Sequence, residues 1–252
     1  MKKYKTGVVL SGGGARGFAH LGILQCLKEN GINPDIISGV SAGAIAGVFI
    51  ASGKSPIETH EILSKGGFLK FTKIQLPTNG LLRLDGLKEL LQKEIPWQNI
   101  EDLELPLYVG TSNLTTGRME YFDSGPIHQI ILASSSIPVL FSPVEMNGCQ
   151  YVDGGVLNNL PIEPLLGKCE KIITINIHPV NETGKLKNLT QVAMRTFHLG
   201  VNKQIETVKK QSDLYIEPKE LYKYDLLKSS KADEVFEIGY NHAKSLNLSI
   251  LK

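Results

Sequence analysis

The stretch that decides the fold is DIISGVSAGAIAGVF, residues 35–49. The pattern at 35–39 is typical of a buried strand, and the apolar run that follows is typical of a small-residue helix. Ser41 stands at the junction between them, flanked by Gly39 and Gly43. A serine on a sharp strand-to-helix turn holds its hydroxyl clear of the backbone, where it can attack a carbonyl. Small residues also allow a strand and a helix to pack closely, so the pentapeptide alone leaves both interpretations open.

Composition is that of an ordinary globular protein, because 42% of the 252 residues are hydrophobic and 21% are charged. The 27 basic and 25 acidic residues nearly cancel, which gives no electrostatic case for nucleic-acid binding. The three cysteines form no CxxC pair, so we expect no disulfide scaffold, no metal site and a reducing compartment. No apolar run approaches the ~18 residues of a membrane span. We therefore expect a cytoplasmic, soluble protein.

Strand and helix patterns alternate along the chain. Buried strands are predicted at 6–11, 35–39 and 171–177, and hairpins at 106–122 and at 143–152, the second around Asn147-Gly148. Helices are predicted at 17–30, 42–52, 85–95 with Asp85 as its cap, 187–210 and 231–246, with a capping box at 55–58 for one more. This alternation, without repeats or linkers, predicts a single α/β domain over residues 1–252 with a mostly parallel sheet.

The segment 66–84 is less regular than the rest of the chain. It mixes Phe68 and Phe71 with Lys70 and Lys73, among other apolar residues. Such a segment can be an interfacial flap whose aromatic residues enter lipid while its lysines meet phosphate. It can equally be a packed connection with solvated lysines. If the segment is a flap, we expect the protein to make transient, peripheral contact with a membrane surface.

A glycine-rich loop, GGGARG at residues 12–17, lies between the first predicted strand and the first predicted helix. Its spacing fits a dinucleotide-binding loop, which also requires an acidic residue at the end of the second strand. Asp35 has about the right separation but begins that strand, and Ser41 follows the strand's end. A nucleotide-binding regulatory domain with a structural Ser41 is therefore the alternative hypothesis, and the weaker one.

The same loop can serve as an oxyanion hole. Glycines at a helix N-terminus leave backbone N–H groups free to stabilise a developing negative charge, and Gly12, Gly13 and Gly14 are placed for this. Arg16 can bind an anionic group of a substrate or hold the loop in place. Gly17 closes the motif where the helix begins.

A third motif, YVDGGV at residues 151–156, follows the Asn147-Gly148 turn. Asp153 ends the predicted strand, and Gly154 and Gly155 leave space around its carboxylate. An Asp-Gly pair alone indicates a turn. Beside an oxyanion loop and an elbow serine, Asp153 is better interpreted as a general base.

The six histidines show no shared motif. Ser41, Asp153 and His178 occur in the serine, aspartate, histidine order that α/β-hydrolases use. In that fold the serine lies later in the chain, whereas Ser41 follows the second recognisable strand. We therefore expect no histidine to act as the base.

With these three motifs in this order, the chain resembles the patatin-like phospholipases, in particular their compact bacterial members. The resemblance covers about residues 6–166 and includes two further segments, ASSSIPVLFSPV at 133–144 and DGGVLNNLP at 153–161. Residues 167–252 match the family only loosely.

The resemblance implies a three-layer α/β/α fold and a lipid-degrading serine esterase without metal or cofactor. It assigns the nucleophile to Ser41 and the base to Asp153, a catalytic dyad, with the oxyanion hole around Gly13 and Gly14. The implied substrate is a phospholipid, a lysophospholipid or another fatty acyl ester.

Overall fold

The described part of the chain covers most of its length. The computed structural model describes residues 3–66, 73–74, 82–179, 186, 192, 195–196, 199–200, 204–227 and 229–251. Most of the segment 66–84, with Phe68 and Phe71, therefore lies outside the described residues. The first part of the helix predicted at 187–210 also lies largely outside them.

In the described part of the chain, an eight-stranded mixed sheet forms the centre of the fold, with strand order β10-β9-β1-β2-β5-β8-β7 and β6 paired to β5. The five strands from β10 to β5 are parallel, and β6, β7 and β8 add antiparallel pairs. The strands are β1 Tyr4–Leu10, β2 Ile36–Gly39, β5 Leu107–Asn113, β6 Arg118–Phe122, β7 Val144–Met146, β8 Cys149–Asp153, β9 Cys169–Ile175 and β10 Leu214–Ile216, and a separate pair joins β3 Lys73–Ile74 to β4 Leu82–Arg83.

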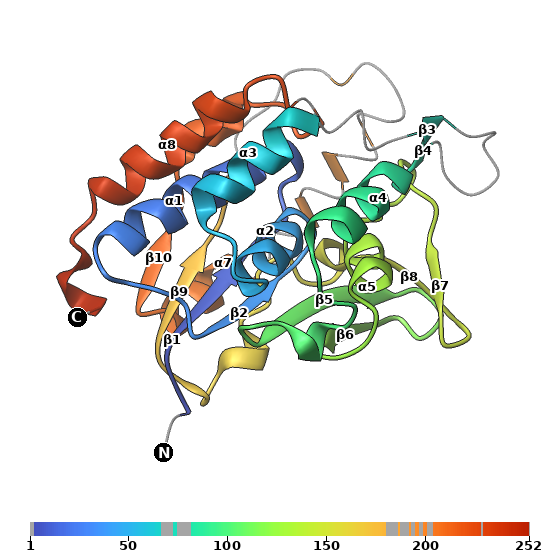
Figure 1. Cartoon of the computed structure of the whole chain (residues 1–252), viewed down its shortest axis with the longest axis horizontal. Coiled ribbons are helices and arrows are strands. Elements are labelled where there is room, and N and C mark those ends of the chain that lie inside the picture. The colour runs from blue at the N-terminus through green and yellow to red at the C-terminus, as the bar shows by residue number, and fades with distance from the viewer. Residues whose placement is uncertain are drawn as a thin grey trace.

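Helices cover both faces of this sheet (Figure 1). The α-helices are α1 Phe18–Glu29, α2 Ala42–Ala51, α3 Pro56–Gly66, α4 Asp85–Glu94, α5 Ile127–Ser134, α7 Ile205–Gln211 and α8 Ala232–Lys244. The 3-10 turns are η1 Gly14–Gly17, η3 Ile100–Asp102, η4 Gly154–Val156, η5 Glu163–Leu165, η6 Lys219–Lys223 and η7 Leu248–Leu251. Figure 1 shows α8 running along α1, so the C-terminal part packs directly on the N-terminal part.

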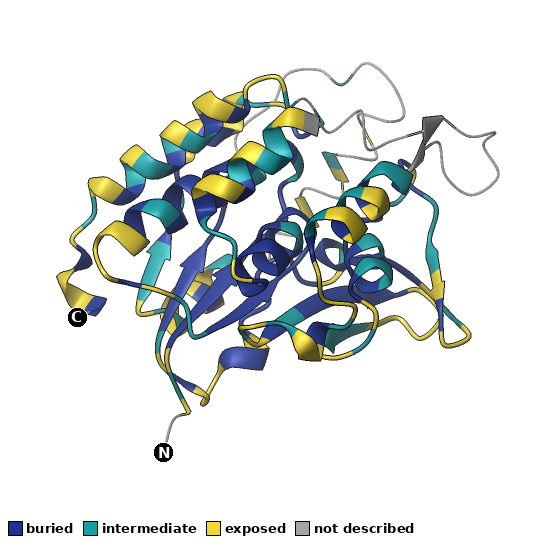
Figure 2. Ribbon diagram, in the orientation of Figure 1, coloured by how far each residue is buried: buried dark blue, intermediate teal, exposed yellow. Residues whose placement is uncertain are grey.

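Alternation along the strands divides the core in two. In β1, Val8 and Leu10 face the larger cluster under α1, α2 and α5, whereas Val9 faces a smaller cluster with Leu165 and Val208. Successive strand residues point to opposite faces, so both faces of this sheet are buried. Figure 2 shows the central strands buried and the outer sides of α3 and α8 exposed. The α/β prediction with helices on both faces of a mostly parallel sheet is confirmed.

Local signals in the sequence placed most turns correctly. Asn147 and Gly148 both have positive φ, 50° and 74°, as a two-residue hairpin turn requires. Ser55 and Glu58 form the reciprocal capping box, since the Glu58 carboxylate accepts from Ser55 N–H at 2.8 Å and Glu58 N–H donates to Ser55 Oγ at 3.2 Å. The prediction that Asp85 caps α4 is wrong, because Leu84 is the N-cap and Asp85 is the first helical residue. A carboxylate at that first position is still favoured by the helix dipole.

Candidate active site

Ser41 occupies a strained turn between β2 and α2. Its φ of 55° and ψ of −122° lie where non-glycine residues rarely go. The turn is tight enough that a Cβ on Gly39 would lie 2.7 Å from the Gly43 carbonyl carbon, and a Cβ on Gly43 would collide with the Leu10 carbonyl. The Gly-x-Ser-x-Gly spacing is therefore a steric requirement of this turn.

Sheet register brings Asp153 to Ser41. Val109 of β5 pairs with Gly39 of β2. Two residues further along β5, Thr111 pairs with Asp153 of β8. Both partners lie on the edge of β5 opposite β6, and β2 runs parallel to β5 while β8 runs antiparallel to it. The C-terminal ends of β2 and β8 therefore point toward each other, and the turn at Ser41 meets the end of β8.

The Asp153 carboxyl is buried, with 2% of the residue exposed. Burial raises its pKa from the ordinary 3.8 to about 7, because the charged form loses its hydration. The Ser41 hydroxyl and the Gly155 N–H, which donates to Asp153 Oδ1 at 2.8 Å, act in the opposite direction and favour the carboxylate. Neither of these donors belongs to a histidine. The arrangement gives Ser41 a proton acceptor that changes charge near neutral pH.

The C-terminal end of α5 holds both members of this pair, and sequence reasoning did not assign that role. The Ser41 N–H donates to Ser134 Oγ at 2.9 Å, and that hydroxyl donates onward to the Gly110 carbonyl at 2.7 Å. The Asp153 N–H donates to the Ser136 carbonyl at 2.9 Å. A run of serines carries no sequence signal for a hydrogen bond to a distant turn, so this role of residues 134–136 is visible only in the structure.

The glycine loop lies beside Ser41, because β1 and β2 are adjacent parallel strands whose carboxyl ends meet at one edge. A Cβ on Gly12 would lie 3.1 Å from the Ser41 Cβ. The Asn159 side chain bonds Gly12 at both ends, accepting from its N–H at 3.1 Å and donating to its carbonyl at 3.4 Å. Among the described residues, the N–H groups of Gly13 and Gly14 have no hydrogen-bond partner. Of the two residues, Gly14 lines the pocket that contains Ser41, whereas Gly13 is buried beneath it, so the Gly14 amide is the better placed to meet a ligand.

The C-terminal part of the chain holds the same loop in place by hydrogen bonds. The Ala15 N–H donates to the Leu226 carbonyl at 2.7 Å. The Arg16 guanidinium donates through Nε to the Tyr224 carbonyl at 2.9 Å and more weakly to Tyr222 at 3.4 Å. Burial lowers the Arg16 pKa to about 10. These contacts are those of an anchor, and a substrate role for Arg16 stays a prediction.

The acidic residue of the alternative hypothesis lies at the other end of the sheet. Asp35 precedes β2, and its carboxylate accepts from the Thr6 N–H at 2.7 Å, near the start of β1. The glycine loop follows Leu10 at the end of β1. Asp35 therefore cannot contact a ribose bound at that loop, as a dinucleotide site would need.

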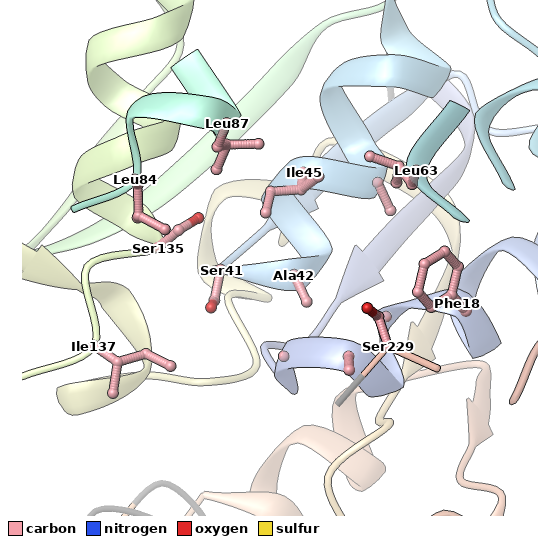
Figure 3. Close-up of a pocket in the computed structure, with 14 residues that line it drawn as sticks. Phe18, Ser41, Ala42, Ile45, Leu63, Leu84, Leu87, Ser135, Ile137 and Ser229 are labelled. Atoms are coloured by element: carbon pink, nitrogen blue, oxygen red, sulfur yellow. The ribbon is translucent and has the colours of Figure 1, made fainter. Parts of the chain in front are cut away.

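An apolar pocket opens at Ser41 (Figure 3). Its hydrophobic walls come from α1, α2, α3, α4 and the residues after α5, and its polar atoms come from the glycine loop and three serines. The residues around it are Gly14, Ala15, Gly17, Phe18, Ser41, Ala42, Ile45, Ala46, Leu63, Leu84, Leu87, Ser135, Ile137 and Ser229. A pocket of this kind, apolar with a few convergent polar groups, suits a largely hydrocarbon ligand.

Within the described residues, no three His, Cys, Asp or Glu side chains lie together as metal ligands would. None of the helices described combines the length and apolar character that a membrane span needs.

We expect Gly14→Ala to lower the turnover of an ester substrate by about 10²–10³-fold, the usual cost of losing one oxyanion donor. Gly14 has φ +55°, and a Cβ there would collide with the Leu226 carbonyl, so the loop must shift. Gly31→Ala is the matched control, because Gly31 also has positive φ but has no atom within 4 Å of an added Cβ. Equal turnover in the two variants, both folded by circular dichroism, would remove Gly14 from the oxyanion site.

The family is established by a sequence model of the patatin-like phospholipases, which matches residues 8–166. This chain belongs to that family, and the expected span of 6–166 is confirmed within two residues. The family is one of lipid hydrolases, and the acidic residue that a dinucleotide site requires lies away from the glycine loop, so both findings disfavour the nucleotide-binding hypothesis.

Individual relatives agree with this assignment. Lysophospholipase NTE1 of Scheffersomyces stipitis is 26% identical over 96% of this chain, which corresponds to 18% of the relative. An NTE family protein of Mycobacterium bovis is 32% identical over 65% of this chain and 46% of the relative. The chain thus spans less than half the length of these curated relatives. Among solved structures, VipD from Legionella pneumophila has the same fold, with a TM-score of 0.54 and 16% identity over 99% of this chain and 67% of VipD.

Proposed function

We propose that the protein is a serine acyl hydrolase of phospholipids, lysophospholipids or related fatty acyl esters, with Ser41 as nucleophile and Asp153 as general base. The observation that carries the proposal is that the Ser41 turn, which lines an apolar pocket, meets the end of β8, where the buried Asp153 carboxyl interacts with the Ser41 side chain. The names of relatives such as lysophospholipase NTE1 support the substrate class.

In the first half-reaction the Ser41 oxygen attacks the ester carbonyl carbon while Asp153 takes the serine proton. The carbonyl oxygen becomes an oxyanion, which accepts hydrogen bonds from the Gly13 and Gly14 N–H groups. When the tetrahedral intermediate collapses, the bond to the alcohol oxygen breaks and Asp153 returns the proton to that oxygen. An acyl-enzyme on Ser41 and a free alcohol result.

In the second half-reaction a water molecule takes the place of the alcohol. Asp153 accepts a water proton as the oxygen attacks the acyl carbon, and it then protonates Ser41 as the fatty acid leaves. The same carboxyl acts in both steps, so it must be ionised at the start of each. A carboxylate of ordinary pKa is a weak base toward a hydroxyl, and burial makes Asp153 a stronger one.

The walls of the pocket suit the acyl chain of the substrate. Phe18, Ile45 and Leu63 are side chains that an alkyl chain can contact without leaving polar groups unpaired. The substrate would enter from a lipid aggregate, and we include a transient contact with a membrane surface in the proposal.

The proposal is tested by incubating the purified protein with lysophospholipids, diacyl phospholipids and monoacylglycerols and measuring the fatty acid released. Trapping with a fluorophosphonate, followed by peptide mass spectrometry, locates the reactive serine. We expect fatty acid release from at least one lipid class and a phosphonate on Ser41. Absence of both reactions in folded protein would contradict the proposal.

We expect kcat/KM for an ester to rise with pH through an apparent pKa of about 7 and to level off above it. The direction follows from the role of Asp153, because only the ionised carboxylate accepts a proton and protonation below pH 7 removes the base. The measurement is a pH–rate profile on an uncharged ester, with folding checked at each pH. A profile that stays flat down to pH 5 would show that the base has an ordinary carboxyl pKa or is another group.

A further inference from the structure

His20 is a fully buried histidine that the proposed reaction does not use. It lies in the first turn of α1, shortly after the glycine loop, and 0% of the residue is exposed. Its Nε2 lies 2.8 Å from the Ser11 carbonyl oxygen. Because a carbonyl oxygen can only accept, Nε2 carries the proton and donates it. Ser11 immediately precedes Gly12, so this hydrogen bond joins the two ends of the glycine loop.

The other ring nitrogen of His20 keeps the imidazole neutral. Nδ1 is buried and has no hydrogen-bond partner among the residues that the structure describes. Protonation would give the buried ring a charge and a second N–H without an acceptor. Burial accordingly lowers the His20 pKa to about 4, although the bond to Ser11 acts in the opposite direction. His20 is therefore a neutral donor over the pH range in which Asp153 titrates.

The peptide group between Ser11 and Gly12 is held at both ends. Its carbonyl accepts from His20, and its N–H donates to Asn159 Oδ1 at 3.1 Å. The Ser11 hydroxyl oxygen also accepts from the Ile177 N–H at 3.0 Å. A peptide group is planar, so its carbonyl and its N–H turn together. This one cannot rotate without breaking hydrogen bonds to two side chains from distant elements.

The fixed peptide matters because only Gly12 and Gly13 separate it from the Gly14 amide, which meets the pocket. Glycine adopts more backbone conformations than other residues, so a loop held at one end would leave the Gly14 N–H poorly aimed. The Arg16 N–H donates to the Gly13 carbonyl at 3.2 Å, which orients the Gly13–Gly14 peptide relative to η1. His20 then fixes the helical end of the loop relative to the end of β1.

We propose that His20 is a positioning residue of the oxyanion site, whose Nε2–H closes the glycine loop on the Ser11 carbonyl and so aims the Gly14 amide at an ester bound to Ser41. The proposal rests on the proposed function. His20 is not one of the residues around the pocket, so it acts through the loop. The amide is needed most when charge develops on the ester oxygen, so losing its aim should lower kcat and leave KM nearly unchanged.

The test compares the parent protein with His20→Leu and His20→Gln on a soluble p-nitrophenyl ester. Leucine has no donor, whereas the glutamine amide nitrogen lies as many bonds from Cβ as Nε2 does and can still donate to Ser11. We expect His20→Leu to lower kcat by about 10²-fold, the scale of a small misplacement at a catalytic site. Its KM and the rise through an apparent pKa of about 7 should persist, because Asp153 is intact. His20→Gln should retain kcat within about tenfold of the parent.

Ser52→Ala is the matched control. It removes another buried hydrogen bond from a side chain to a carbonyl, 2.8 Å long, but at the end of α2 away from Ser41. It should keep the parental kcat. The proposal is overturned if folded His20→Leu does so too, if its loss falls on KM, or if His20→Gln is as slow as His20→Leu.

A second measurement does not depend on how well the leucine variant folds. In the imidazole ¹⁵N NMR spectrum of the parent protein, His20 is identified as the signals that His20→Gln lacks. We expect the neutral Nε2–H tautomer from pH 5 to pH 8, and titration in that range or a proton on Nδ1 alone would contradict the proposal. Failure of the proposed function is recognised separately, because then the parent protein hydrolyses no ester and takes up no fluorophosphonate, whatever the state of His20.

Discussion

Ser41→Ala should abolish ester hydrolysis and fluorophosphonate labelling while the protein stays folded. Removing the nucleophile of a serine hydrolase costs about 10⁶-fold in kcat, which places the residual rate below detection in an ordinary assay. The pocket, the oxyanion loop and Asp153 remain, so lipid binding should persist. Turnover is measured with a fatty acyl ester, and labelling is measured by intact-protein mass spectrometry.

Ser41→Gly is the matched control for this variant. Glycine adopts a φ of 55° without strain, whereas alanine at this position keeps the backbone strain of the parent serine. We expect both variants to be inactive and Ser41→Gly to melt at the higher temperature. If Ser41→Ala still hydrolysed the ester at a rate within tenfold of the parent, Ser41 could not be the nucleophile.

Asp153→Asn should lower turnover by about 10⁴-fold or more, the scale seen when the partner of a catalytic serine is lost. Asparagine keeps the size of the side chain and can still accept from the Gly155 N–H, but it cannot take the Ser41 proton. His178→Ala is the control, because His178 is the first histidine after Asp153 and lies just past the C-terminal end of β9. It should retain most activity. Loss of activity in a folded His178→Ala protein would favour a triad in place of the dyad.

The same Asp153→Asn variant should be more heat-stable than the parent at pH 8. The folded protein binds the Asp153 proton more tightly than the unfolded chain, since its pKa is about 7 when folded and 3.8 ordinarily. The stability linked to that proton is present below about pH 4 and is lost as the pH rises through about 7. Asparagine stays neutral, so the difference in melting temperature should grow from pH 5 to pH 8. A constant difference over that range would contradict the raised pKa.

Much of the fold could be predicted because its signals are local. The apolar strands at 6–11 and 35–39, the Asn147-Gly148 turn and the capping box at 55–58 each depend on a few neighbouring residues. Strand order is not local, and no pattern in the sequence indicated that β2 and β8 share one edge of β5. The misplaced cap of α4 has a similar cause, since capping depends on one residue's backbone angles, which residue type alone does not determine.

The candidate site likewise has a part that local sequence motifs reveal and a part that depends on contacts between distant residues. Ser41, Asp153 and the glycine loop lie in short motifs whose steric needs limit the residues allowed, so they could be recognised without a structure. The residues that position them could not. Ser134 and Asn159 bond backbone groups more than 90 residues away, and Leu226 acts through its carbonyl, which any residue has.

The most direct test of the Ser41–Asp153 pair is the pH dependence of the rate at which a fluorophosphonate modifies Ser41, because this reaction has no lipid to bind and no deacylation step. The rate is followed by intact-protein mass spectrometry in the parent, in His178→Ala and in Asp153→Asn. We predict that the first two share a rise through an apparent pKa of about 7 and that Asp153→Asn reacts slowly, without this rise. If Asp153→Asn keeps the parental profile, or if His178→Ala loses it while folded, Asp153 is not the base that activates Ser41.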